Sequence, residues 1–140
     1  MVAGKKPLVV VIDRSSEILT WLYSVLYGEG FLVATCTPTL EALRYVSSYK
    51  PDLAIVGWEA LKGDDSSLLR KIREISPETK ILLRAVSTDE PSETEALGAG
   101  ADLLLRNPYV WGDISTCVAR LLGGRYPAKE ESTSRFSCIF

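Results

Sequence analysis

The sequence predicts an α/β fold in which five parallel strands form a doubly wound sheet with helices on both faces. Short runs rich in β-branched residues, such as PLVVVI at residues 7–12, alternate along the chain with stretches of helical periodicity. The helical stretches between successive runs are too long for hairpin turns. We therefore expect the strands to pair in parallel, through right-handed crossovers.

The first unit is a buried strand followed by a helix. Residues 7–12 form an uninterrupted apolar run that ends at Asp13, as expected for a strand covered on both faces. From Glu17 to Tyr27 the apolar residues recur at helical spacing, and Gly28 ends the pattern.

The second unit repeats this order. Residues 31–36 (FLVATC) predict a strand, and the helix after it has Thr37 and Pro38 as its N-cap and first residue. The inner face of this helix is expected to consist of Leu40, Leu43 and Val46.

Three further units complete the sheet. They are a strand over residues 53–58, a helix over 66–75 with Leu68, Leu69 and Ile72 inward, a strand over 80–86, a short helix over 91–97, a strand over 101–105 and a helix over 111–122. This layout is flavodoxin-like, with strand order 2-1-3-4-5. We expect one domain over residues 1–124 and, because residues 125–140 lack periodicity, a flexible C-terminal tail.

Composition excludes several classes of function. Sixteen Lys and Arg against eighteen Asp and Glu give a net charge of −2, too balanced for a protein that neutralises nucleic-acid phosphates. The chain has no His, which excludes Ser-His and Cys-His catalysis and His-containing metal sites. Its three Cys residues are widely spaced, and no apolar run is long enough for a membrane span or signal peptide. We expect a cytoplasmic protein that is not an enzyme and needs no metal or cofactor.

In a doubly wound sheet the working crevice lies beyond the carboxyl ends of the strands. Three stretches of sequence converge there: VVVIDRSSEIL, PDLAIVGW and GAGADLLLRNPY. At these stretches, and over residues 6–124 almost without gaps, the chain resembles the receiver domain of two-component response regulators, the CheY-like fold.

This resemblance implies a degenerate phosphorylation pocket, because only one of the family's functional residues is kept. Asp13 matches the first of the two acids that hold Mg²⁺. The phosphoacceptor position is Gly57, the second acid is Arg14, the hydroxyl position is Ala85 and the lysine position is Asn107. The resemblance therefore indicates a pseudo-receiver that lacks the phosphoacceptor Asp.

The residues support this interpretation without the family. Gly57 has no side chain that could form an acyl phosphate, and Asp13 alone is a poor site for Mg²⁺. Arg14 either pairs with Asp13 or points to solvent. Arg84, a charge within an apolar strand, either lies at an exposed end or reaches Glu59 or Asp13.

The remaining acids and the aromatic residue at the crevice have several interpretations. Asp52 lies at the wrong end of its strand to accept a phosphate, and Glu59, Asp64 and Asp65 are expected to be solvated loop acids. Trp58 is expected to fill the core or cover the crevice as a lid, with a ligand or a partner as alternatives.

We expect the protein to act as a protein-binding module in signal transduction, with a histidine kinase, a regulator or an output domain as partner. The face that receivers commonly use would here draw on Glu93, Glu95, Leu104, Arg106, Tyr109 and Trp111. The alternative is a sensor of a small anion, nucleotide or quinone in the vacated crevice. A flavin carrier is disfavoured because the loop DRSSE lacks a Ser/Thr-rich phosphate-binding run. Neither nucleic acid nor membrane is expected as a partner, and a homodimer remains open.

Overall fold

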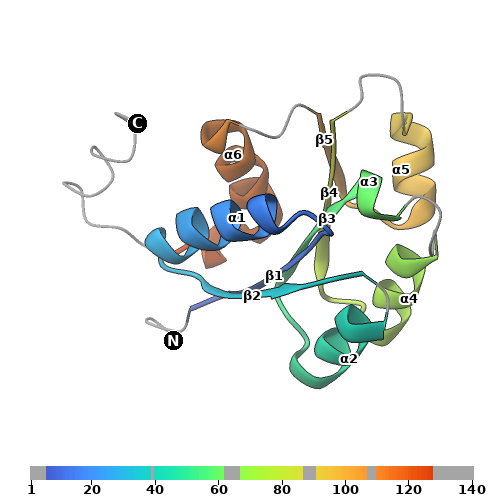
Figure 1. The fold of residues 1–140 in the computed structure, drawn as a ribbon, viewed down its shortest axis with the longest axis horizontal. Helices are drawn as coiled ribbons and strands as arrows, with labels where there is room; N and C mark the ends of the chain where they lie inside the picture. The colour runs from blue at the N-terminus through green and yellow to red at the C-terminus, as the bar shows by residue number, and fades with distance from the viewer. Residues whose placement is uncertain (1–5, 39, 62–66, 87–90, 107–109, 128–140) are drawn as a thin grey trace.

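The computed structural model describes residues 6–38, 40–61, 67–86, 91–106 and 110–127. Five parallel strands form one sheet in the order β2-β1-β3-β4-β5 (Figure 1), which confirms the predicted fold and strand order. The strands are β1 (Leu8–Ile12), β2 (Leu32–Cys36), β3 (Leu53–Gly57), β4 (Lys80–Ala85) and β5 (Leu103–Arg106).

Helices cover both faces of this sheet. They are α1 (Ser16–Gly28), α2 (Leu40–Tyr49), α3 (Trp58–Leu61), α4 (Leu68–Ile75), α5 (Glu93–Ala99) and α6 (Trp111–Leu122), followed by a 3-10 turn, η1 (Gly123–Arg125). Helices α1 and α6 lie on one face, and α2, α4 and α5 lie on the other (Figure 1).

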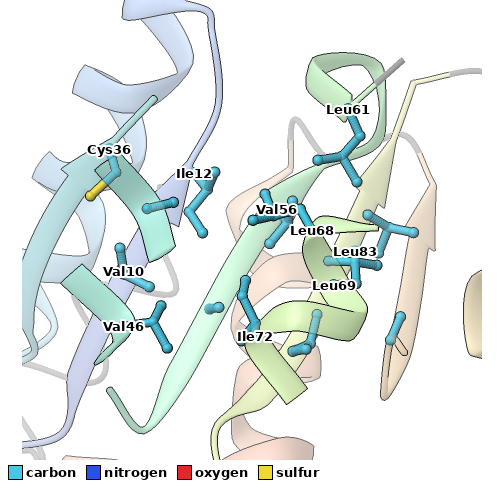
Figure 2. Packing of buried hydrophobic residues seen from close by; sticks show 14 of the residues in the cluster. Val10, Ile12, Cys36, Val46, Val56, Leu61, Leu68, Leu69, Ile72 and Leu83 are labelled. Carbon is cyan, nitrogen blue, oxygen red and sulfur yellow. The ribbon is translucent and has the colours of Figure 1, made fainter. Parts of the chain in front are cut away.

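Alternation along β1 explains why the central strands are apolar throughout. Val9 and Val11 belong to the cluster under α1 and α6, whereas Val10 and Ile12 belong to the cluster under α2, α4 and α5. Figure 2 shows the second cluster, in which Ile72 of α4 packs with these β1 residues and with β3. Every residue of β3 is buried, as a strand covered on both faces requires.

Several element boundaries differ from the predictions. Helix α2 begins at Leu40, so Thr37 and Pro38 are not its N-cap and first residue, and α5 is Glu93–Ala99 instead of residues 91–97. Leu40, expected on the inner face of its helix, is 60% exposed because it is the first residue of α2, and Ala42 is buried in its place. Trp58, expected to end a strand, instead begins the short helix α3 directly after Gly57. Helix α3 turns the chain over the carboxyl end of the sheet.

The domain extends beyond the predicted boundary at residue 124. The Tyr126 ring packs edge-on against Phe31 with 5.2 Å between ring centroids, and its hydroxyl donates a hydrogen bond to Glu29 at 3.2 Å. Arg125 forms an ion pair with Asp52 at 2.9 Å. Residues 128–140 of the predicted tail lie outside the described residues.

One arginine ties the last two units of the fold together. The Arg73 guanidinium on α4 donates to the backbone carbonyls of Thr79 and Gly100 at 3.1 and 2.8 Å, and to Asp102 at 2.6 Å. Asp102 also accepts a hydrogen bond from the backbone of Ile81 at the start of β4. This network fixes the turn between α5 and β5. Among the described residues, no helix is long and apolar enough to cross a membrane.

Candidate functional site

The expected crevice corresponds to the place where β1, β3 and β4 end side by side, and the name is kept here for these strand ends. Asp13 follows the last residue of β1, Gly57 is the last residue of β3, and Arg84 is the penultimate residue of β4. Gly57 is paired in register with Arg84, so the two residues lie next to each other at the edge of the sheet. Strand β3 lies between β1 and β4, which places Gly57 between Asp13 and Arg84.

Asp13 and Arg84 form a buried ion pair across this crevice. The Nη2 atom of Arg84 contacts Oδ2 of Asp13, and the two side chains are only 6% and 9% exposed. The other carboxylate oxygen of Asp13 accepts a hydrogen bond from the backbone of Ser15 at 2.9 Å. Of the partners considered for Arg84 from the sequence, Asp13 is therefore confirmed. A guanidinium, rather than a metal ion, neutralises the acid that the chain has kept.

Gly57 makes this ion pair sterically feasible. A Cβ atom at position 57 would overlap Oδ2 of Asp13, and it would lie 3.1 Å from Cγ of Asp13 and 3.2 Å from Nη2 of Arg84. The space that a side chain would need is thus filled by the two charged groups. The requirement for glycine here is a close approach of side chains to the backbone and not an unusual backbone angle.

From β4, the side chain that reaches Asp13 is that of Arg84, the residue in register with Gly57. Ala85, which the resemblance matches to the family's hydroxyl position, is the next residue along β4. Successive side chains alternate between the two faces of a strand, so the fully buried Ala85 faces away from this contact. Arg14, the other candidate partner of Asp13, has an exposed side chain.

Helix α3 covers the crevice from the β3 side. The exposed Glu59 accepts a hydrogen bond from the backbone of Val86 at 3.1 Å, which links α3 to the end of β4. Trp58 is half-buried and packs against the core cluster under α2, α4 and α5. Two nitrogen atoms, Nε1 of Trp58 and Nε of Arg84, are buried and have no hydrogen-bond partner among the described residues.

The other side chains near the strand ends have no feature of a reactive group. Burial and the neighbouring Glu41 raise the pKa of the Cys36 thiol at the end of β2 to about 11, so it stays protonated and unreactive near neutral pH. Asp52 lies at the opposite end of β3, where it accepts a hydrogen bond from the backbone of Leu8 at 2.8 Å. Asp64, Asp65 and Asn107 lie outside the described residues. Within the described ranges, no cluster of three or more Cys, Asp or Glu side chains could hold a metal ion.

The face predicted to bind partners is only partly available. Glu95 is held by Ser92 in a capping box at the start of α5, Leu104 and Trp111 pack partly into the two core clusters, and Arg106 bonds the carbonyl of Pro91. Glu93 is exposed, and Tyr109 lies outside the described residues. Two residues that the sequence analysis missed are prominent here: Leu97 is 52% exposed and Val110 is 58% exposed.

Comparison with known proteins identifies the family. Residues 9–118 match the response regulator receiver domain. The chain belongs to this family. As a receiver domain, it is 29% identical over 119 residues to the transcriptional regulatory protein PrrA of Mycobacterium tuberculosis, a match that covers 85% of this chain and 51% of PrrA. It is 30% identical over 106 residues to the KDP operon transcriptional regulatory protein KdpE of Escherichia coli, covering 76% of this chain and 47% of KdpE. The receiver domain thus spans about half the length of these relatives.

Solved structures agree with this assignment. A response regulator from Thermotoga maritima superposes with a TM-score of 0.75 at 25% identity, covering 86% of this receiver domain and all of the other chain. The signal receiver domain of an HD domain-containing protein from Pseudomonas fluorescens superposes with a TM-score of 0.76 at 20% identity, covering 86% and 98% of the two chains. The second likeness concerns the fold alone.

Proposed function

We propose that this receiver domain is a pseudo-receiver, which does not accept a phosphoryl group and acts in two-component signalling by binding another protein. The contact between Asp13 and Arg84 in the space beside Gly57 is the main support for this proposal. An acyl phosphate needs a carboxylate at position 57, and Mg²⁺ needs carboxylate oxygens that are free to coordinate it. Here the first is absent from the sequence, and Asp13 is occupied by a guanidinium and a backbone N–H.

The ion pair between Asp13 and Arg84 also supports signalling through a single conformation that a partner protein recognises. Receivers that respond to phosphorylation change conformation when a new charge enters the pocket, whereas Arg84 supplies a permanent charge. We therefore propose that the partner recognises one constant conformation. The partner would be a histidine kinase, another regulator or an output domain, in the cytoplasm, and neither nucleic acid nor membrane would bind.

The test is direct mass measurement after incubation with acetyl phosphate and Mg²⁺. We expect no phosphoryl adduct on this chain. A receiver with an intact phosphoacceptor serves as the control for the reagents, and it should be modified under the same conditions. We also expect affinity for a captured partner to be unchanged by beryllofluoride. An Mg²⁺-dependent adduct on any Asp or Glu of this chain would contradict the proposal.

A small ligand in the crevice is a second candidate function, and one observation favours it. Nε1 of Trp58 and Nε of Arg84 are buried donors without a partner among the described residues, and unpaired buried donors are costly. A ligand with carbonyl or carboxylate acceptors could satisfy them. A thermal-shift screen with nucleotides, quinones and small carboxylates tests this candidate. Stabilisation that disappears in Trp58→Phe, which keeps the ring but removes the N–H, would support it, and absence of stabilisation would remove it.

A further inference from the structure

Strand β2 is an edge of the sheet, since β1 is its only neighbouring strand in the part of the chain that the structure describes. The backbone N–H of Leu32 donates to the carbonyl of Pro7 at 3.0 Å, and the carbonyl of Cys36 accepts from Asp13 at 3.1 Å. Residues 32, 34 and 36 thus direct their backbone groups toward β1. In a parallel ladder the intervening residues face the other way, so the N–H and C=O groups of Val33 and Thr35 point out of the sheet.

Among the described residues, this edge has none of the features that usually prevent pairing with another strand. Proteins protect open edges with charged residues, proline, bulges or a covering segment. The strand LVATC contains no charge and no proline, and it pairs with β1 in continuous register from Leu32 to Cys36 without a bulge. Leu32 is 49% exposed. Its five residues therefore form an uncharged, regularly paired template for an added strand.

The segment that contains β2, from Ile18 in α1 to Leu40 at the start of α2, carries almost no charge, and the nearest charged residues outside it are Glu17 and Glu41. Within it the only formally charged residue is Glu29, which is buried and accepts a hydrogen bond from Tyr126. The exposed large side chains of this region are apolar or aromatic: Tyr27 on α1 is 62% exposed and Leu40 on α2 is 60% exposed. Depletion of charge together with exposed aromatic residues is typical of a protein interface.

We propose that β2 pairs in antiparallel fashion with β2 of a second copy of this chain, about a two-fold axis at Ala34. Val33 of one copy then lies opposite Thr35 of the other, and both residues have outward backbone groups that exchange hydrogen bonds. Ala34 meets its own copy at the axis, where the two Cα atoms of a non-hydrogen-bonded pair approach to about 4.5 Å, and a methyl side chain fits this close approach.

The absence of charge favours a second copy over a different protein as the occupant. A two-fold interface brings each residue near its own equivalent, so any charge near the axis would face a like charge. The uncharged segment around β2 avoids this repulsion, and it offers nothing that an oppositely charged partner would recognise. The inference concerns the edge opposite to β5 and does not depend on whether the receiver can be phosphorylated.

Sedimentation velocity across a range of protein concentrations tests the proposal with the full chain. We expect a reversible dimer with a dissociation constant on the order of micromolar, as is common for small interfaces. The decisive variant is Thr35→Pro, which removes an outward N–H that the β1–β2 ladder does not use. It should weaken the dimer at least about tenfold, equivalent to ~1.4 kcal/mol. Thr35→Val keeps the N–H and should leave the dimer intact.

Two further variants guard against misfolding and against a different interface. Leu32→Lys adds a charge to an exposed edge residue and should also weaken the dimer, with an unchanged circular dichroism spectrum as evidence of folding. Val110→Lys alters an exposed residue near the opposite edge and should have no effect. The proposal is overturned if the wild type stays monomeric at every concentration, if Thr35→Pro and Leu32→Lys remain fully dimeric, or if Val110→Lys alone dissociates the dimer.

Discussion

Replacement of Gly57 by alanine should destabilise the receiver far more than its single methyl group suggests. The added Cβ would overlap Oδ2 of Asp13 and lie 3.2 Å from Nη2 of Arg84. Inserting atoms into a well-packed region costs about 1–3 kcal/mol. If Asp13 moves to relieve the overlap, its buried ion pair breaks, and loss of one partner of such a pair costs about 3–5 kcal/mol. We expect a loss of ~3 kcal/mol in the free energy of unfolding, between these limits.

Urea unfolding followed by tryptophan fluorescence measures this loss, and Gly98→Ala provides the matched control. A Cβ at Gly98 on α5 would meet nothing within 4 Å, so alanine there should be neutral or stabilise by up to about 1 kcal/mol through its helix propensity. The two variants add the same methyl group to the same protein. Their difference therefore isolates the crowding beside the ion pair.

A double-mutant cycle with Arg84→Ser connects the cost to the ion pair itself. Without Arg84, Asp13 is free to turn away from position 57, so Gly57→Ala should cost less in the Arg84→Ser background than in the wild type. We expect a coupling free energy of about 1–2 kcal/mol. Strict additivity of the two substitutions, or a Gly57→Ala protein as stable as the wild type, would refute the reasoning.

Three further predictions concern other parts of the molecule. Trp58 fluorescence should not respond to millimolar Mg²⁺, because Asp13 is already paired; quenching that saturates would show a metal site. Arg73→Leu should lower the free energy of unfolding in urea by about 2 kcal/mol, since it removes the charged partner of Asp102 and the side-chain donor to the carbonyls of Thr79 and Gly100, and an unchanged midpoint would contradict this. Burial raises the pKa of Cys36 to about 11 and also raises the pKa of Tyr126, so the folded state retains protons that the unfolded chain loses. Stability should therefore fall as pH rises above about 9, and Cys36→Ala should reduce that slope, as thermal melts between pH 8 and 11 would show.

Much of the fold could be predicted because its signals are local and repeated. The alternation of β-branched runs with helical stretches predicts a parallel sheet, and a residue such as Asp13 at the end of a buried run marks the edge of the sheet. The predictions were wrong for residues whose exposure or position depends on tertiary packing. The exposure of Leu40 depends on where α2 begins, and the position of Tyr126 depends on Phe31, which is remote in sequence.

The site shows the same division. The absence of a phosphoacceptor carboxylate could be predicted from Gly57, because it depends only on which residue occupies that position. The role of Arg84 was left open, since an arginine in an apolar strand has several routes to a partner and only the register with Gly57 selects one. Ala85, which the resemblance matches to the family's hydroxyl position, lies one residue beyond Arg84 on β4, and in a strand one residue is enough to change the face of the sheet.

The bridge between β1 and β4 also bears on how this lineage can change. Asp13 and Arg84 are not on neighbouring strands, and they meet only by passing over the bare end of β3. An acidic side chain at position 57 would overlap the Asp13–Arg84 ion pair. If Arg84 were replaced first, the buried carboxylate of Asp13 would lose its charged partner. Each step is harmful before the other is taken, so descendants of this protein are confined to routes that keep the arginine and the glycine together.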